Sequence, residues 1–273
     1  MDAEERFAFG ENWQAFLATL DGARIEQAES SLREMLAVDS LVGRTFLDIG
    51  SGSGLFSLAA HRLGADVVSI DYDTQSVACT AELKRRYADE ATNWRVQQGS
   101  VLDEALMASL GHFDVVYSWG VLHHTGDMDR AIEFARQRVD TNGRFFIAIY
   151  NDQGGASRRW LAIKKTYNRL PTWLRPLWVI TVAFWYEMKF ALARLARGKN
   201  PLPFADWRAK KRDRGMSAWH DWVDWVGGLP FEVATPERMI VPLRQHGFVL
   251  DNLKTVGNGW GCNEFVFRNT AHS

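Results

Sequence analysis

Three glycines at alternate positions follow directly on a short apolar run, in the sequence Phe46-Leu-Asp-Ile-Gly-Ser-Gly-Ser-Gly-Leu55. A strand that runs straight into such a turn and then into a helix is the opening of a βαβ unit. Glycine permits the tight turn and lets a ligand approach the backbone N–H groups beside the N-terminus of the helix. The sequence therefore predicts a parallel sheet with a ligand-binding turn after its first strand.

Alternating strand and helix patterns continue to about residue 150. Strands are predicted over residues 44–49, 66–70, 94–97, 113–117 and 143–150. The helices predicted around and between them cover residues 13–38, 55–63, 74–86 and 128–139. A further helix over 236–246 and two closing strands over 248–253 and 263–267 complete the pattern. Strands and helices of this length that alternate imply right-handed crossovers and helices on both faces of the sheet.

Composition places the chain among globular proteins. Of its 273 residues, 47% are hydrophobic and 24% are charged, with a formal charge of −1, which excludes a disordered chain. Cys79 and Cys262 are too few for a disulfide framework, so we expect a reduced, cytoplasmic setting. The first ten residues contain no apolar run, so we expect no secretory signal.

The near-neutral total conceals a strong asymmetry. Residues 157–214 contain fifteen Lys and Arg against three acidic residues, a net charge of +12, which leaves −13 on the rest of the chain. Eight of the twelve tryptophans lie within residues 157–225. The chain is thus expected to carry a basic, aromatic insert inside an otherwise ordinary α/β sequence.

Two carboxylates accompany the glycine turn. Asp71 ends the second predicted strand, twenty-one residues after Gly50, where a carboxylate can accept the hydroxyls of a ribose. Asp48 precedes the turn, where it would repel a pyrophosphate but attract an ammonium group. The third glycine also comes one position too early for a dinucleotide fingerprint. A nicotinamide cofactor is therefore disfavoured, as is a turn that only packs.

The pattern D-x-G-x-G-x-G resembles the first motif of class I S-adenosylmethionine-dependent methyltransferases, and the closest general likeness is to the ubiquinone-biosynthesis type. The resemblance continues through Gly99–Asp103, Phe113–His124 and Asn142-Gly143. It implies a doubly wound, mostly parallel, seven-stranded Rossmann-like α/β sheet and S-adenosyl-L-methionine as cofactor. The chain departs from the family at Ser100, where an acid commonly contacts the adenine amine. The implied cofactor-binding residues are Asp48, Gly50, Ser51, Gly52, Gly54, Asp71, Tyr72, Ser100, Val101, Ser118 and Trp119.

His123 and His124 are the candidate catalytic residues. They follow the fourth predicted strand, and a histidine pKa suits removal of a proton from an acceptor hydroxyl. The alternative is that they pack beneath the adenosine or bond to backbone. A metal site with Asp127 lacks a third convergent ligand, so no metal is expected.

The insert offers several interpretations. Residues 177–196 form an amphipathic pattern, which predicts either a cap over the catalytic domain or a peripheral membrane contact through 172–197; we favour the cap. Its longest charge-free run is too short to span a membrane. Nucleic acid is a minority alternative, because the cations do not form a stripe. Trp219, Trp222 and Trp225 indicate a pocket wall or core packing, and Phe7–Trp13 a lid or simply a helix start.

We therefore expect a helical segment over 1–40, a cofactor-binding core over 41–152 and 232–273, and a helical cap over 153–231. The expected reaction is methyl transfer to oxygen or nitrogen of a hydrophobic or lipid-linked small molecule. The alternatives are a methyltransferase acting on tRNA or protein, with the basic insert for docking, and a non-catalytic membrane-associated module that retains the cofactor site.

Overall fold

The computed structural model describes residues 20–198, 200–202, 218–257 and 259–271. Within these residues the chain divides into two compact units, which we treat separately. The sheet unit comprises residues 20–153 and 230–271, and the helical unit comprises the described part of 154–229. The predicted lid at Phe7–Trp13, and the start of the predicted helix over 13–38, lie outside the described residues.

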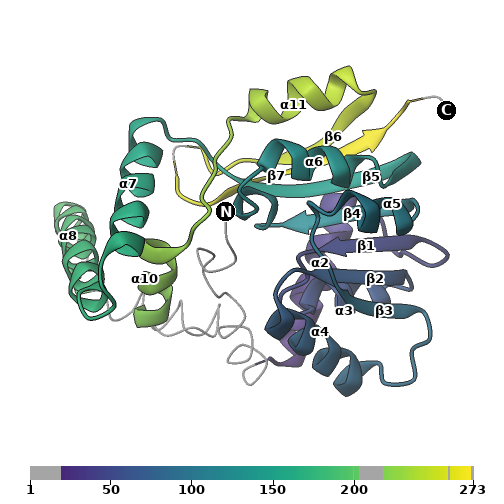
Figure 1. Ribbon diagram of the computed structural model, residues 1–273, viewed down its shortest axis with the longest axis horizontal. Coiled ribbons are helices and arrows are strands. Elements are labelled where there is room, and N and C mark those ends of the chain that lie inside the picture. Colours follow the sequence, from purple (N-terminus) through teal and green to yellow (C-terminus); the bar gives the residue numbers. More distant parts are fainter. Residues whose placement is uncertain (1–19, 199, 203–217, 258, 272–273) are drawn as a thin grey trace. The chain divides into compact units, whose positions relative to one another are not determined.

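The sheet unit is built on one seven-stranded sheet in the order β3-β2-β1-β4-β5-β7-β6 (Figure 1). The first five strands of that order are parallel, and β7 is antiparallel to both of its neighbours. This confirms the predicted doubly wound, mostly parallel sheet. The strands are β1 (Thr45–Ile49), β2 (Asp66–Asp71), β3 (Trp94–Gln98), β4 (Phe113–Trp119), β5 (Val139–Tyr150), β6 (Phe248–Lys254) and β7 (Cys262–Asn269).

Helices cover both faces of this sheet. Most connect successive strands, as right-handed parallel crossovers require. They are α2 (Gly22–Leu36), α3 (Leu55–Arg62), α4 (Thr74–Tyr87), α5 (Glu104–Ser109), the 3-10 helix η2 (Leu122–His124), α6 (Met128–Arg136) and α11 (Pro236–Gln245). The six-residue helix α5 was not predicted, because it is too short to show an apolar period.

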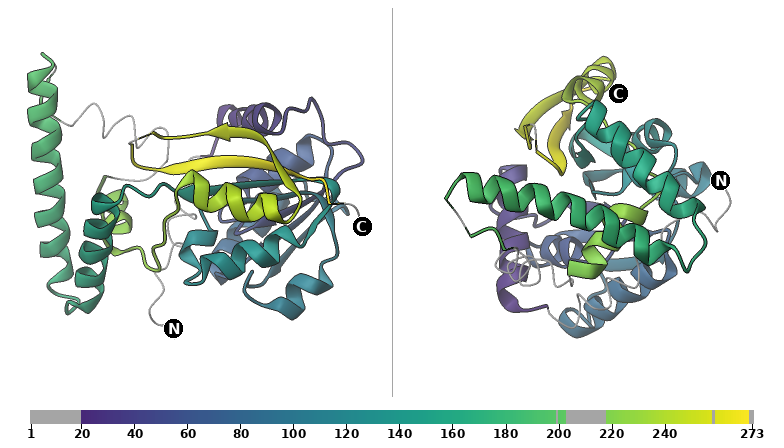
Figure 2. Two further views of the ribbon diagram at one scale, coloured as in Figure 1. Left: turned by 90° about the horizontal axis from the view of Figure 1, so that it is seen from above. Right: turned by 90° about the vertical axis from the view of Figure 1, so that its left-hand side faces the viewer.

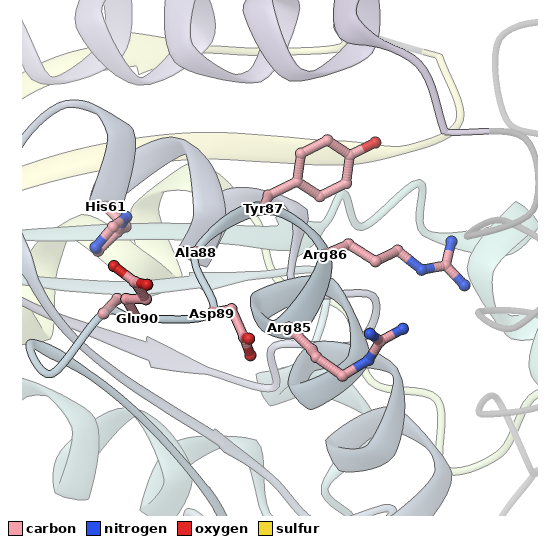
Figure 3. Close-up of a pocket in the computed structure, with 8 residues that line it drawn as sticks. His61, Arg85, Arg86, Tyr87, Ala88, Asp89 and Glu90 are labelled. Atoms are coloured by element: carbon pink, nitrogen blue, oxygen red, sulfur yellow. The ribbon is translucent and has the colours of Figure 1, made fainter.

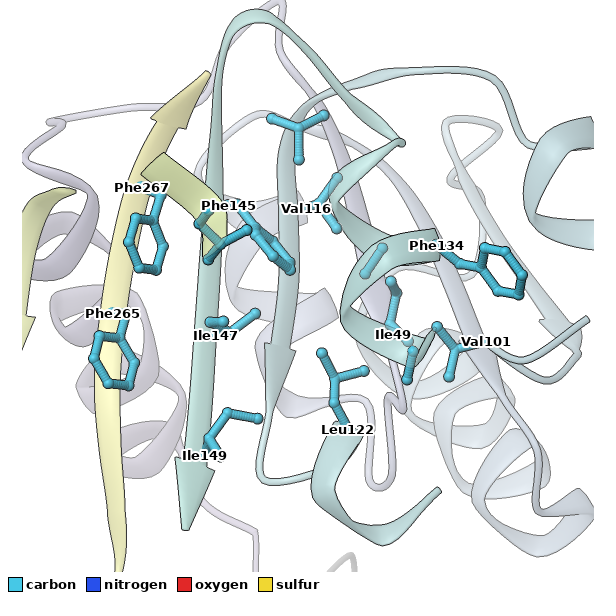
Figure 4. Close-up of a cluster of buried hydrophobic side chains, with 14 of the residues drawn as sticks. Ile49, Val101, Val116, Leu122, Phe134, Phe145, Ile147, Ile149, Phe265 and Phe267 are labelled. Carbon is cyan, nitrogen blue, oxygen red and sulfur yellow. The ribbon is translucent and has the colours of Figure 1, made fainter. Parts of the chain in front are cut away.

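Alternate strand residues face two separate cores. On one face, Leu47 and Ile49 of β1 pack with α5, α6 and α11, together with Phe145, Ile147 and Phe265 (Figure 4). On the other face the intervening residues pack with α2, α3 and α4. Because successive side chains of a strand point to opposite faces, strands buried on both sides read as continuous apolar runs, as these do.

The start of β5 differs from the prediction. The strand begins at Val139 rather than at residue 143, and its register against β4 shifts between Phe113 and Val115. Asn142 has φ +62°, and a Cβ on Gly143 would come within 3.0 Å of the Phe113 carbonyl oxygen. Asn142 and Gly143, which were expected to open the strand, instead form an irregularity within it.

The helical unit contains α7 (Gly155–Arg169), α8 (Arg175–Ala196) and α10 (Ala218–Gly227), which contact one another. Figure 2 shows α8 as a long, straight helix. Aromatic rings fill the interior: Trp160 stacks on Tyr186 with centroids 4.9 Å apart and lies 5.7 Å from Trp225. Trp222 is buried beside Tyr186, whereas Trp219 is 43% exposed. Trp222 therefore occupies a core position of this unit, and Trp225 is partly buried beside Trp160.

Lysine also contributes to this interior. Lys164 is buried, and its Nζ donates a hydrogen bond to the Trp225 carbonyl oxygen at 2.7 Å. Asn168 donates to the Gly227 carbonyl oxygen at 2.9 Å. Both acceptors belong to the last turn of α10, where a cation and amide donors satisfy carbonyl groups that have no partner within the helix. Two polar side chains of α7 thus fix the end of α10.

Candidate functional site

The glycine turn has the strained backbone that its sequence predicts. Gly50, Gly52 and Gly54 have φ of +78°, +55° and +80°, a region that favours glycine over residues with a Cβ. The Gly50 and Ser51 N–H groups donate to the Ile70 carbonyl oxygen at 2.8 and 3.1 Å, which ties the turn to the end of β2. A Cβ on Gly50 would come within 2.4 Å of the Val121 side chain, so this position requires glycine for space as well.

The carboxylate of Asp71 is held against this turn. Its Oδ2 accepts the Gly52 N–H at 2.9 Å, and its Oδ1 accepts the Asp73 N–H at 2.9 Å. Burial raises the pKa of Asp71, and the hydrogen bonds from these two N–H groups act in the opposite direction. The predicted pairing of Asp71 with the glycine turn is thus present as a direct contact.

The carboxylate of Asp48 lies at one end of a buried chain of hydrogen bonds. Its Oδ2 accepts from Ser57 Oγ at 2.5 Å, and Ser57 Oγ lies 2.6 Å from Ser69 Oγ. Trp94 Nε1 donates to Ser69 Oγ at 2.9 Å. Burial raises the pKa of Asp48 to about 7, against the hydrogen bond from Ser57, and repulsion from the Asp71 carboxylate adds to the rise.

Sequence analysis missed Ser57, Ser69 and Trp94. Each is fully buried or nearly so. The available signal was a serine inside an apolar helix and another inside an apolar strand, since such hydroxyls need a partner when they are buried. Ser57 bonds Asp48 directly, and Ser69 and Trp94 extend the chain from Ser57.

The charges of Asp48 and Asp71 are not neutralised by protein cations in the described part of the chain. There, neither carboxylate forms an ion pair with Lys, Arg or His. Two half-buried or buried carboxylates beside the glycine turn favour a ligand that carries both positive charge and hydroxyl groups.

The residues predicted after β3 differ in accessibility. Ser100 Oγ accepts the Leu102 N–H at 3.1 Å, so the hydroxyl shapes the loop that leads to α5. Val101 is 5% exposed and belongs to the core on the α5–α6 face. Tyr72, after β2, is 47% exposed. Asp103 caps α5 by accepting the Leu106 N–H at 3.0 Å, so its carboxylate is already used.

The end of β4 brings polar residues next to β1. Ser118 is fully buried and donates to the Ile49 carbonyl oxygen at 2.9 Å, which fixes β4 beside the start of the glycine turn. Trp119 is 44% exposed and hydrogen-bonds the Glu264 carboxyl group, whose pKa burial raises. Glu264, from β7, was not identified from the sequence.

Tyr117 is a second residue that the sequence did not single out. It pairs with Asp48 across β1 and β4 and is 2% exposed. Among the described residues its hydroxyl has no hydrogen-bond partner, and burial, followed by the charge of Asp48, raises its pKa. A buried hydroxyl in this condition is a group that a polar ligand can satisfy.

The two candidate catalytic histidines occupy different environments. His123 is fully buried, and its ring lies 4.1 Å from that of Tyr150. His124 is partly exposed, and its Nδ1 lies 2.5 Å from the Pro230 carbonyl oxygen. Because a carbonyl only accepts, Nδ1 must carry the proton, and in the neutral ring the lone pair then lies on Nε2. Of the two, only His124 has both partial exposure and a defined tautomer.

A metal-binding cluster and a surface hollow are the two other kinds of site to consider. Within the described ranges, no three His, Cys, Asp or Glu side chains gather as a metal-binding group. A shallow surface hollow is lined by His61, Arg85, Arg86 and residues 87–91 (Figure 3). It lies where α4 ends and before β3 begins, at the opposite end of the strands from the glycine turn, and its charges are mixed. It is therefore not the candidate site.

Comparison with known proteins points to the part of the chain that contains the glycine turn and Asp71. Residues 47–145 match the model of a family described as a methyltransferase domain. Ubiquinone biosynthesis O-methyltransferase from Sinorhizobium medicae is 32% identical over 124 residues, which are 45% of this chain and 48% of the relative. The namesake from Methylobacterium sp. is 31% identical over 122 residues, 44% and 46% of the two chains. The match therefore spans about half the length of these relatives.

Solved structures share the fold at low sequence identity. Magnesium protoporphyrin IX methyltransferase from Synechocystis PCC 6803, with bound SAH, has a TM-score of 0.53 and 13% identity, over 90% of this chain and 83% of that chain. An O-methyltransferase family protein from Burkholderia thailandensis has a TM-score of 0.54 and 11% identity, over 92% and 58%.

The seven-stranded sheet, the glycine turn with Asp71 and the match of residues 47–145 to a methyltransferase domain together support a class I, S-adenosylmethionine-dependent methyltransferase. The relatives given above are named ubiquinone biosynthesis O-methyltransferases, and their matches cover 44–45% of this chain.

Proposed function

We propose that this protein transfers the methyl group of S-adenosylmethionine to an oxygen or nitrogen atom of a hydrophobic or lipid-linked small molecule. One observation carries the choice of methyl donor: Asp48 and Asp71 are buried or half-buried carboxylates without a cationic partner among the described residues, and Asp71 is bonded to the glycine turn. The donor combines an ammonium group, a sulfonium and a ribose, which are the charges and hydroxyls that these carboxylates suit.

The residues fit this molecule as follows. Asp48 would receive the ammonium group, and the Asp71 carboxylate would accept the ribose hydroxyls while keeping its bond to Gly52. Val101 and Ser118 are covered by protein atoms, so we assign them to shaping the site rather than to polar contact. The full proposed set is Asp48, Gly50, Ser51, Gly52, Gly54, Asp71, Tyr72, Ser100, Val101, Ser118 and Trp119.

We assign the general base to His124 rather than to the buried His123. Bound S-adenosylmethionine supplies a methyl group that is electrophilic because its sulfur carries a positive charge. In the displacement, the bond from the acceptor oxygen to the methyl carbon forms, and the carbon–sulfur bond breaks, its electron pair returning to sulfur. His124 Nε2 accepts the proton that the acceptor hydroxyl loses, while Nδ1–H stays on the Pro230 carbonyl. Such a base contributes roughly 10²- to 10⁴-fold in rate.

The acceptor class rests on two supports. Two relatives that match 44–45% of this chain are named ubiquinone biosynthesis O-methyltransferase. We take the substrates of ubiquinone biosynthesis as the guide to the chemical class of the acceptor. The neighbourhood of His124 is also aromatic, since its ring lies 5.3 Å from that of Tyr150, which lies 5.6 Å from Phe231.

The test is to incubate the full chain with methyl-labelled S-adenosylmethionine and an extract of its own host, then separate organic, small aqueous and macromolecular fractions. We expect label in the organic phase. Label in RNA or protein would instead favour a methyltransferase of macromolecules. Cofactor binding without label in any fraction would favour a non-catalytic module.

The control is a matched pair of variants on β2. Asp71→Asn should strongly reduce both the label and cofactor binding, since it removes the carboxylate that contacts the glycine turn. Asp66→Asn changes the same side chain at the exposed, opposite end of that strand and should leave both unchanged. Equal labelling by the two variants would contradict the assignment of Asp71.

A further inference from the structure

Helix α8 has one face packed within the helical unit. Val179 and Val182 are its buried residues, and Tyr186, one turn further on, stacks on Trp160 of α7. Trp178 Nε1 donates to the Ile163 carbonyl oxygen at 3.3 Å, which adds a polar tie to α7. Small β-branched residues and one aromatic ring therefore define the inner side of the helix.

The opposite face is apolar and exposed. Its exposed fractions are 65% for Phe184, 61% for Trp185 and 44% for Met188. Seven large apolar residues share this condition: Leu177, Ile180, Phe184, Trp185, Met188, Leu192 and Leu195. At 100° per residue they cover an arc of about 140° directly opposite Val179, Val182 and Tyr186. No charged residue lies inside this arc, which we call the outer face of α8.

The sequence left two uses of this helix open, a cap over the catalytic domain and a peripheral membrane contact. The apolar stripe of residues 177–195 was expected to pack inward if the helix served as a cap. In the helical unit its members are exposed, apart from Trp178, and a different set of residues packs against α7 and α10. An exposed apolar patch of this extent marks a surface that contacts another phase or partner.

Charged side chains lie at both edges of the outer face, and the segment that contains α8 is basic as a whole. Lys189 Nζ lies 4.8 Å from the centre of the Trp185 ring, at one edge of the arc. At the other edge, Arg194 pairs with Glu187 at 3.8 Å. Exposed cations on α7 and after α8 add to this charge: Arg158, Arg159, Lys165, Arg169 and Arg197. Residues 157–214 as a whole carry +12.

We propose that the outer face of α8 docks on the surface of an anionic phospholipid bilayer. Aromatic and aliphatic side chains would enter the acyl boundary while lysine and arginine meet the headgroups, as in helices that lie in the membrane plane. No helix of the described residues is long and apolar enough to cross a membrane. The purpose of the contact, delivery of a lipid-linked acceptor, rests on the proposed function, but the contact itself does not.

Charge distinguishes this occupant from the alternatives. A second copy of the chain on the same face would bring two strongly basic segments together, which like-charge repulsion opposes. An RNA would require cations within the contact surface, and the arc contains none. An anionic lipid surface matches both the apolar centre and the basic edges.

The test is sedimentation of the full chain with phosphatidylcholine vesicles that contain about one-third phosphatidylglycerol, beside vesicles of phosphatidylcholine alone. We expect binding to the anionic vesicles and a marked weakening at high salt, since surface charge acts only within a Debye length. The double variant Phe184→Ser, Met188→Ser removes two large side chains from the middle of the outer face. We expect its partition constant to fall at least about tenfold.

A matched control is Val249→Ser, Leu253→Ser, which removes two exposed apolar side chains from β6 of the sheet unit. It should bind vesicles as the wild type does. Circular dichroism and calorimetry with S-adenosylmethionine serve to check that both double variants are folded.

Several outcomes would overturn the proposal. These are wild-type chain that stays in the supernatant, equal binding by the two double variants, or a dimer without lipid that becomes monomeric in Phe184→Ser, Met188→Ser. Vesicle binding without methyl transfer to any extract would leave the outer-face proposal standing and refute the proposed function. Methyl transfer without vesicle binding would refute the outer-face proposal and leave the proposed function standing.

Discussion

The sheet unit buries the carboxylate of Asp48 and half-buries that of Asp71, whereas the helical unit buries the ammonium group of Lys164. The lysine is satisfied within its own unit, because it meets the carbonyl end of α10. The carboxylates meet hydroxyl and N–H groups but, in the described residues, no cation. A buried charged group whose partners lie within the protein contributes to structure. A buried charged group without an oppositely charged partner in the protein indicates a ligand that supplies one.

The two units also place apolar residues differently. The central strands of the sheet are buried on both faces, so most of their apolar side chains are covered within the unit. In α8 only Val179 and Val182 are buried, and the larger apolar side chains lie outside. The contrast separates a unit built around a small charged ligand from one built around an extended surface contact.

The largest expected effect tests whether chemistry is confined to the sheet unit. In His124→Asn the amide nitrogen can replace Nδ1 as donor to the Pro230 carbonyl, but no basic nitrogen remains. We expect kcat to fall about 10²- to 10⁴-fold with cofactor affinity unchanged. Steady-state kinetics and calorimetry measure the two quantities. Loss of the acidic limb of the pH–rate profile should accompany the change, and an unaltered kcat would exclude His124 as the base.

The next effect measures how much of the cofactor affinity depends on Asp71. Replacing its carboxylate by an amide weakens the bond from Gly52 and the bonds proposed for the ribose. We expect Kd for S-adenosylmethionine to rise about 100-fold in Asp71→Asn, since hydrogen bonds to charged groups contribute about 1.5–3 kcal/mol each. Calorimetry decides this. A change below threefold would mean that the ribose lies elsewhere.

A smaller, pH-dependent effect is expected at Asp48. Its pKa is raised to about 7 in the folded protein from 3.8. The stability that its protonated form contributes is therefore complete below about pH 4 and is lost as the pH rises through 7. Asp48→Asn cannot ionise, so relative to wild type the ligand-free variant should gain stability at pH 8 and none at pH 4.

Thermal melts at these two pH values measure that difference, at roughly 2–4 °C per kcal/mol. The same ionisation should govern binding, because a cationic ligand prefers the carboxylate. Wild-type affinity should thus decrease by up to about tenfold per pH unit below 7. Calorimetry should show a flatter pH profile for Asp48→Asn. Parallel profiles for the two proteins would contradict a contact between Asp48 and the ammonium group.

The smallest effect should remain within the helical unit. Lys164→Met removes the donor to Trp225 but also the cost of burying a charge, so we expect a net loss of only about 1–3 kcal/mol. Hydrogen exchange should become faster in α7 and α10 and stay unchanged in the sheet. Faster exchange around β1 and β2 would show that the two units share one folding transition.

Most of the sheet could be predicted because its strands are apolar on both faces and end at punctuating residues such as Gly50 and Asp71. Family resemblance supplied the roles of individual residues in the candidate site, and those assignments remain proposals. The hydrogen-bond chain from Asp48 through Ser57 and Ser69 to Trp94 could not be predicted. These residues are distant along the chain, and only the packing of α3 and β3 against β2 brings their side chains together.

The orientation of α8 shows a second limit. The helix is apolar around much of its circumference, so its period alone cannot say which side faces inward. Stacking of Tyr186 on Trp160 settles the question, and that contact depends on a residue of another helix. The sequence therefore predicts the apolar arc but leaves open whether it packs against protein or faces outward.

The buried Asp48 has a consequence for the lifetime of the protein. At neutral pH and above, the ligand-free chain bears the desolvation cost of a carboxylate with no cation beside it among the described residues. A ligand that supplies the cation stabilises the folded state by mass action, while the empty chain opens more often and is exposed to proteases. We therefore expect the cellular abundance of this protein to follow the supply of S-adenosylmethionine, so that starvation for the methyl donor removes enzyme as well as substrate.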